Sequence, residues 1–265
     1  MRGRGQWTIF IISLKCAVER RRRILKMLED VPGELEILQA IDGRKGLPKE
    51  WISKVDFDAM KTNLGRRMTD AECACALSHL EVYKLIIGRG LPGAVVLEDD
   101  TVWSQEATDC LHALMPGELD FVQFDYGSAA IWRFLPGRRV QGTNVRLRRL
   151  AKNAPFANAY LLSNRAAQYL LRKSCPVMLP ADWPCRLSPL RPMLCVPRVC
   201  FQSDKDVEAS YLEESRNSAR LKKSSFNSHR GKEEIAFVSS RNPEPNLPRI
   251  LKKFLIERIP KEKRL

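Results

Sequence analysis

The sequence predicts an α/β fold in which a mostly parallel, twisted sheet carries helices on both faces. Two observations support this prediction. Segments with the pattern of buried strands alternate with amphipathic helices up to residue 100, which is typical of right-handed strand–helix–strand units. Acidic residues follow two of the expected strands, at residues 98–100 and at Asp125, where open α/β sheets bind their ligands.

Each expected element has its own sequence signature. Strands are short apolar or alternating runs, and helices repeat apolar residues every three or four positions. The clearest helix start is a capping box, in which Thr69 is the cap and Glu72 follows three residues later. In chain order, strands are expected at residues 8–14, 34–40, 95–97, 119–125 and 157–162, and helices at residues 19–28, 69–87 and 163–173.

The remaining segments are assigned from composition. Residues 44–68 are polar and are expected to be irregular, and the proline-rich segment 176–197 is expected to be an ordered but irregular loop with short extended pieces. Three units are predicted. They are a folded domain at 8–215, a polar flexible linker at 216–246, and a basic amphipathic helix at 247–265.

The net charge of +14 calls for an anionic partner. Arg133–Arg149 contains six arginines and no acid, and residues 241–265 contain eight basic residues against three acids. Neither segment interleaves aromatic residues as an RNA-binding sheet does, and no helix-turn-helix or zinc-finger pattern is present. Nucleic-acid binding is therefore the alternative function, and our expectation is that the protein has no nucleic-acid partner.

Cysteine spacing and hydropathy argue against a zinc-binding, a disulfide-bonded and a membrane-spanning protein. The eight cysteines are scattered, and Cys73-Ala-Cys75 lacks the spacing of a zinc knuckle, which His79 four residues later does not complete. Free thiols of this kind fit a reducing compartment. No apolar run approaches the roughly 18–20 residues that span a bilayer. We therefore expect a cytoplasmic protein.

The most informative segment is Val95–Asp100, an apolar run that ends in three consecutive carboxylates. Three adjacent charges cannot be buried unpaired, because each would carry a large desolvation penalty. A strand end facing a divalent cation or a polyhydroxyl ligand resolves this conflict. The alternative is a solvated acidic turn.

Four segments, in order, resemble glycosyltransferase family 25, the lipopolysaccharide and lipooligosaccharide glycosyltransferases, which also includes collagen galactosyltransferases. Residues 11–20 are similar to the family's first strand and arginine-bearing turn, and residues 39–43 to its A-x-D-G sequence. Residues 75–79 match its C-A-L-S-H helix, and residues 96–100 match its acidic motif. The resemblance covers roughly residues 8–215.

The sequence departs from the family pattern at four positions. Ser13 stands where Asn is usual, Ala74 where Gly is usual, Asn158 where His is usual, and Thr101 where Val is usual.

The resemblance implies that residues 8–215 form a GT-A-type nucleotide-binding glycosyltransferase domain with an irregular acceptor lobe. It also implies transfer of a hexose, with inversion, from a UDP-sugar to a lipid-linked oligosaccharide. The expected reaction moves galactose from UDP-galactose to a lipooligosaccharide core sugar. A carboxylate-bound Mn²⁺ or Mg²⁺ would neutralise the departing diphosphate. The expected metal ligands are Asp100 and Asp99. A non-catalytic family member is a second alternative, which Asn158 suggests.

The resemblance also assigns roles to other side chains. Inversion requires a base opposite the leaving group, and the candidates are Asp182 and Asp125. Trp183, beside Asp182, is a candidate for stacking on a sugar ring. For some donor-site residues a structural role is an alternative: a solvated helix face for Arg20, a turn for Asp42, and a structural hydrogen bond for His79. The expected donor-binding residues are Ser13, Arg20, Asp42, His79, Glu98 and Asp99.

The C-terminal segment has apolar residues at helical spacing with basic residues off that face. This pattern is typical of a helix lying on an anionic membrane surface, which would make the protein peripheral on the inner face of the cytoplasmic membrane. The alternative is a helix docked on the catalytic domain through the same apolar face. The apolar residues are Leu247, Ile250, Leu251, Phe254, Leu255 and Ile259.

Overall fold

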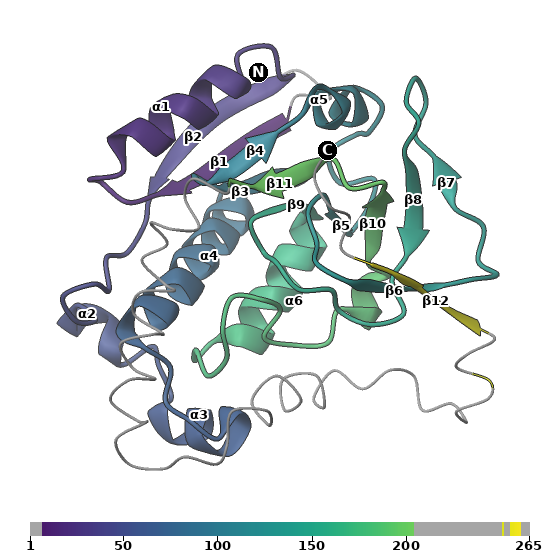
Figure 1. The fold of residues 1–265 in the computed structure, drawn as a ribbon. Coiled ribbons are helices and arrows are strands. Elements are labelled where there is room, and N and C mark those ends of the chain that lie inside the picture. Colours follow the sequence, from purple (N-terminus) through teal and green to yellow (C-terminus); the bar gives the residue numbers. More distant parts are fainter. Residues whose placement is uncertain (1–6, 204–250, 252–254, 261–265) are drawn as a thin grey trace.

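The computed structural model describes residues 7–203, 251 and 255–260. A central sheet lies between helices on both faces (Figure 1). The helices are α1 (Val18–Met27), α2 (Lys49–Ile52), α3 (Phe57–Leu64), α4 (Asp70–Gly88), α5 (Gln105–His112) and α6 (Asn164–Ser174), with a 3₁₀ turn at Ser188–Leu190.

The central sheet has eight strands. They are β1 (Trp7–Ser13), β2 (Gly33–Gln39), β3 (Gly93–Glu98), β5 (Phe121–Gln123), β7 (Arg138–Arg139), β8 (Arg146–Arg149), β9 (Ala159–Ser163) and β10 (Met193–Val196). Their order across the sheet is β2-β1-β3-β9-β5-β10-β8-β7. Two further pairs flank it: β4 (Thr101–Trp103) with β11 (Cys200–Gln202), and β6 (Ala129–Trp132) with β12 (Ile256–Ile259).

The sheet is mixed, which refines the prediction of a mostly parallel one. β1 pairs in parallel with β2 and β3, and β10 with β5, but β9 and β8 run antiparallel to their neighbours. Every residue of β9 is buried, so its sequence carries no alternation that reveals the direction of its neighbours. Despite these reversals, β1, β2, β3, β5 and β10 all end on the same side of the sheet.

Alternating side chains on the central strands divide the core into two layers. In β1, Ile9 and Ile11 pack with α1 and α5, whereas Phe10 and Ile12 pack with α4 and α6. The β1–β3 register sets Ile12 opposite Glu98. Ser13 and the carboxylates after Glu98 therefore leave the sheet side by side.

Helix α4 is fixed at its start by the predicted capping box. The Thr69 hydroxyl accepts from the Glu72 amide, and the Glu72 carboxylate accepts from the Thr69 amide. Gly43 allows the loop after β2 to pass against this first turn, because an added Cβ would lie 2.3 Å from the Asp70 carbonyl oxygen. The Ser78 hydroxyl then accepts from the Ile41 amide at 2.9 Å. Two of the matched segments, 39–43 and 75–79, are thus in direct contact.

Several expected loops contain regular structure. Residues 44–68 include the helices α2 and α3, which were not expected, and β10 is one of the short extended pieces expected in the proline-rich segment 176–197. The arginine-rich segment supplies β7 and β8. These strands are short, and pairing with distant strands stabilises them, so no local periodicity reveals them. Within the described residues, no helix is both long and apolar enough to cross a bilayer.

The predicted amphipathic helix at 247–265 is wrong over residues 256–259, which form β12 and pair antiparallel with β6. Ile256 and Ile259 are buried, and Ile259 packs with Tyr126 and Ile131. Strand pairing thus overrides the helical spacing, since β-branched residues suit a half-buried strand. This segment docks on the domain predicted to end at residue 215. The predicted linker at 216–246 lies outside the described residues.

We predict that Ile259→Ala lowers the free energy of unfolding by about 2 kcal/mol, because it removes buried methyl groups from the packing against Tyr126. The measurement is urea denaturation of the full chain. Arg258→Ala, at an exposed position of the same strand, is the matched control. Equal stability of the Ile259 variant and the wild type would contradict the docked strand.

Candidate functional site

The candidate site is built around the acidic turn, defined as Glu98, Asp99 and Asp100. Glu98 is the last residue of β3, as the sequence predicts, and the next two residues form a turn before β4. The backbone amide of Glu98 donates to the carbonyl oxygen of Asn158 on the β9 side. The three carboxylates therefore sit where β1, β3 and β9 meet, at the predicted side of the sheet.

Asp99 turns toward β1 and α1. Its carboxylate accepts a hydrogen bond from the Ser13 hydroxyl, and its Oδ1 lies 3.6 Å from a guanidinium nitrogen of Arg20. Burial raises the pKa of Asp99, and the Ser13 hydrogen bond and the positive charge of Arg20 act in the opposite direction. Three residues predicted to bind the donor are thus in contact.

Asp100 is the most strongly perturbed carboxylate of the acidic turn. It is 8% exposed, and the Gln202 side-chain amide donates to its Oδ2 at 2.9 Å. Its Oδ1 is buried and has no hydrogen-bond partner among the described residues. Burial, and then the negative charge of Glu98, raise the pKa of Asp100 to about 7.

These observations fit a hard divalent cation at Asp100. Mn²⁺ and Mg²⁺ prefer oxygen ligands, and a buried carboxylate oxygen without a partner is an open ligand position. A cation there would also remove the cost of ionising Asp100. Asp99 fits the role of second ligand less well, because Ser13 and Arg20 already bind its carboxylate.

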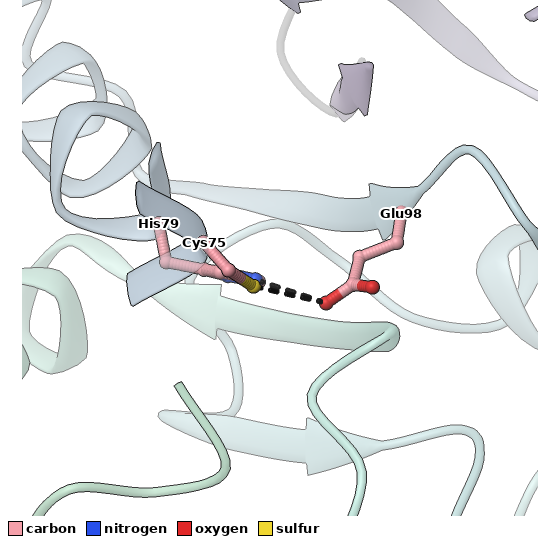
Figure 2. Close-up of side chains that lie close together, drawn as sticks. All are labelled: Cys75, His79 and Glu98. Carbon is pink, nitrogen blue, oxygen red and sulfur yellow. Dashed lines mark hydrogen bonds and ion pairs between the residues drawn. The ribbon is translucent and has the colours of Figure 1, made fainter. Parts of the chain in front are cut away.

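Glu98 points to the opposite layer, toward helix α4 (Figure 2). Its Oε1 lies 3.2 Å from His79 Nε2, and the Cys75 thiol lies 4.0 Å from the same oxygen. The three ligand atoms all lie within 4.8 Å of one another. The predicted metal residues Asp99 and Asp100 are not part of this group.

His79 also has a structural contact. Its Nδ1 lies 2.8 Å from the Tyr160 hydroxyl, which is itself 3.0 Å from the Tyr83 hydroxyl. The ring is 3% exposed, so it is held inside the α4 layer with only its Nε2 side facing the acidic turn. His79 therefore makes the expected structural hydrogen bond and contacts the acidic turn as well.

Asp125 follows β5 and is fully buried. Its Oδ2 accepts from the Asn158 side-chain amide at 2.9 Å, and its Oδ1 lies 3.3 Å from an Arg198 guanidinium nitrogen. Burial raises the pKa of Asp125, and the contacts with Asn158 and Arg198 counteract this shift. Asn158 also connects Asp125 to the acidic turn, because its carbonyl accepts from the Glu98 amide and the Thr101 hydroxyl.

Asp182 is exposed on the loop after α6, in contrast with Asp125. The adjacent Trp183 is 3% exposed and packs edge-on against Phe121 and Tyr160, with ring centroids 4.7 and 5.0 Å away. The suggestion that Trp183 stacks on a sugar is therefore wrong, because its ring is part of the core. This packing places Trp183, the chain neighbour of Asp182, against Tyr160, the partner of His79.

Asp42 lies in the loop after β2 and its side chain is 47% exposed. Both its oxygens accept from the Arg44 guanidinium, at 2.9 and 2.6 Å. These hydrogen bonds lower the pKa of Asp42. The carboxylate thus stays ionised, and its contact with Arg44 supports the alternative of a local turn.

Four residues that were not predicted as site residues contact the predicted ones. Gln202 reaches Asp100 because β11 pairs with β4, and Arg198 reaches Asp125 from the segment just before β11. Neither has a local signal, since both positions depend on long-range pairing. Cys75 and Tyr160 lie inside matched segments, and only their contacts with Glu98 and His79 reveal their place in the site.

A family model described as glycosyltransferase family 25 (LPS biosynthesis protein) matches residues 6–184. The chain belongs to this family.

Curated relatives of this family member agree with the match. This chain is 30% identical over 182 residues to procollagen galactosyltransferase 1 of Danio rerio, and the aligned region is 66% of this chain and 30% of that protein. It is 32% identical over 121 residues to procollagen galactosyltransferase 2 of Mus musculus, or 44% and 19% of the two chains. A mouse protein named inactive glycosyltransferase 25 family member 3 is 30% identical over 111 residues, or 40% and 19%. The chain spans less than a third of these relatives.

We predict that Asp100 makes the metal-free protein less stable as the pH rises from about 4 to 7. The folded protein keeps the Asp100 proton up to about pH 7, whereas the unfolded chain releases it near pH 3.8. The free energy of unfolding of the wild type, minus that of Asp100→Asn, should fall by about 1.4 kcal/mol per pH unit in this window and level off above it. Urea titrations in EDTA measure both proteins, and a constant difference would contradict the shifted pKa.

Proposed function

We propose that this glycosyltransferase family 25 member transfers galactose from UDP-galactose to a hydroxyl of a lipooligosaccharide core sugar, with inversion. The observation that supports this proposal is the partly buried acidic turn, in which Asp100 is buried and has an oxygen without a described partner, and Arg20 lies beside Asp99. This arrangement combines an open cation position with a nearby guanidinium, and a departing nucleoside diphosphate needs both. The galactosyltransferase names of two relatives support the choice of sugar.

The geometry supports a role in donor binding for four side chains. Asp100 would hold Mn²⁺ or Mg²⁺, which supplies charge neutralisation for the diphosphate when bound. Arg20, half-buried beside Asp99, would place its positive charge next to the phosphates. Ser13 and Asp99 hold Arg20 and the turn in place. We propose the GT-A-type arrangement on this basis, since strands β1 and β3 present the site at their carboxyl ends.

We propose Asp182 as the base that takes the proton of the acceptor hydroxyl. Its carboxylate is exposed, so an acceptor sugar can reach it, and the buried ring of Trp183 fixes its backbone. Asp125 is fully buried and both its oxygens are already bonded. We therefore propose that Asp125 positions Asn158, and through it the acidic turn.

A lipid-linked acceptor would bring the protein to the inner face of the membrane. Strand β12 docks on the domain, so its apolar residues do not supply the anchor that the sequence suggested. The arginine-rich segment is a more suitable surface, because exposed guanidinium groups there would meet anionic lipid. Its exposed arginines are Arg133, Arg138, Arg139 and Arg146.

We predict that UDP together with Mn²⁺ raises the melting temperature of the protein and that EDTA abolishes the increase. A ligand that binds only the folded state stabilises it by mass action. Differential scanning fluorimetry measures the shift, and Asp100→Asn should reduce it strongly. If oligonucleotides stabilise the protein and UDP with Mn²⁺ does not, the alternative of a nucleic-acid-binding protein is correct.

We predict that Asp182→Asn lowers kcat by about 10²- to 10⁴-fold while the KM for the UDP-sugar stays near the wild-type value, because general-base catalysis acts on the acceptor proton. The assay is transfer from a panel of UDP-sugars to truncated lipooligosaccharide acceptors. Unchanged kcat would exclude Asp182 as the base.

Asp125→Ala is the contrasting variant, because we expect it to lower the stability of the protein through the loss of a buried ion pair and not through the loss of a base. It leaves the buried Arg198 without a carboxylate, and it should cost about 3–5 kcal/mol of stability.

A folded wild-type protein that binds UDP with Mn²⁺ but transfers no sugar to any acceptor would instead identify a non-catalytic family member, like the relative named inactive.

A further inference from the structure

Cys75, His79 and Glu98 form a group of possible metal ligands that is separate from the Asp100 position (Figure 2). Cys75 and His79 are one helical turn apart on α4, so they face the same way. Glu98 comes from the end of β3 and points into the space between them. The sequence spacing argued against zinc, but a spacing rule does not include a third ligand from a distant strand.

The geometry of the group is close to that of a tetrahedral zinc site. Around Zn²⁺, a sulfur, a nitrogen and an oxygen ligand lie about 3.4–3.6 Å from one another, given the usual bond lengths. His79 Nε2 and Glu98 Oε1 are 3.2 Å apart, and Cys75 Sγ is 4.0 Å from the same oxygen. Small side-chain movements would therefore bring all three to a common centre.

A second hydrogen bond orients His79 for this role. Its Nδ1 bonds the Tyr160 hydroxyl at 2.8 Å, and Tyr160 is held by Tyr83. Metal-binding histidines commonly use their other ring nitrogen in this way, which fixes the ring and the tautomer. The Tyr160 contact leaves Nε2 as the nitrogen that faces Glu98 and Cys75.

The ligand types distinguish this position from Asp100. A thiolate and an imidazole favour Zn²⁺ over Mn²⁺ and Mg²⁺, whereas the Asp100 carboxylate favours the harder ions. A Cys75 thiolate and the Glu98 carboxylate would also neutralise the two charges of the ion, which limits the cost of burying it. Glu98 is 24% exposed, so water can reach the fourth position.

We propose that Cys75, His79 and Glu98 bind Zn²⁺, with a water molecule as the fourth ligand. The ion would connect α4 to the end of β3 and so fix the acidic turn relative to the helix. Because the ligands are three side chains of this chain, the proposal does not depend on the proposed sugar transfer.

Cobalt binding tests the proposal in the absence of any nucleotide or sugar. Co²⁺ added to the full chain should give one equivalent of tetrahedral visible bands, with a near-ultraviolet charge-transfer band from a cobalt–thiolate bond, and Zn²⁺ should displace both. The parent protein carries Cys16→Ser and Cys175→Ser, because these two thiols are exposed. Cys75→Ser should abolish the charge-transfer band, and Glu98→Gln should weaken binding at least tenfold.

Asp100→Asn is the matched control, since it removes the hard-ion position and should retain the cobalt bands. Zn²⁺ at about 100 times its Kd should also raise the melting temperature of the parent by roughly 5 °C or more, and not that of Cys75→Ser. Absence of the charge-transfer band, or its persistence in a folded Cys75→Ser protein, would overturn the proposal. Loss of the bands in Asp100→Asn would overturn it as well, because the ion would then sit at Asp100.

Discussion

The desolvation of three adjacent carboxylates is the constraint on which the site depends. The acidic turn continues a strand whose residues 93–97 are buried, so none of its charges has full access to water. Each carboxylate meets this cost differently. Glu98 faces His79 and Cys75, Asp99 binds Ser13 and Arg20, and Asp100 keeps one oxygen without a described partner and a pKa near 7. The third arrangement leaves a buried oxygen without a described partner, which is why we propose Asp100 as the position for a cation.

The surrounding helices and strands determine where the three carboxylates and their contacts lie. Helix α4 carries His79, and its start is held by the capping box and by the loop that passes over it at Gly43. Asn158 lies directly before strand β9; its carbonyl fixes the backbone of the acidic turn and its side chain binds Asp125. An amide at this position donates to a carboxylate and carries no charge, so the departure from the family's histidine is compatible with a buried Asp125–Arg198 pair.

Local patterns in the sequence predicted the first half of the fold and the core of the site. Strands β1, β2 and β3 and helices α1 and α4 follow from apolar periodicity and a capping box, because these signals lie within each segment's own sequence. The strand β9 was predicted, but its direction was not, and the direction of β9 and the strands β10 and β12 depend on pairing with distant strands, which local periodicity does not encode. Gln202 and Arg198 illustrate the same limit within the site, since β11 brings them to their carboxylates from about 70 to 100 residues away.

The two layers of the sheet give the acidic turn two chemically different sides. On the α4 side, Cys75 and His79 place a sulfur and a nitrogen beside the Glu98 carboxylate. On the other side, Arg20 contacts Asp99 and Gln202 contacts Asp100, and the ligand atoms for a cation there are carboxylate oxygens. Ligand softness then determines which ion each side prefers, even though both sides share one backbone turn. A rigid connection at Glu98 would also restrict the movement of the next two residues. An ion on the helix side can therefore pre-organise the carboxylate that a nucleotide-bound cation requires.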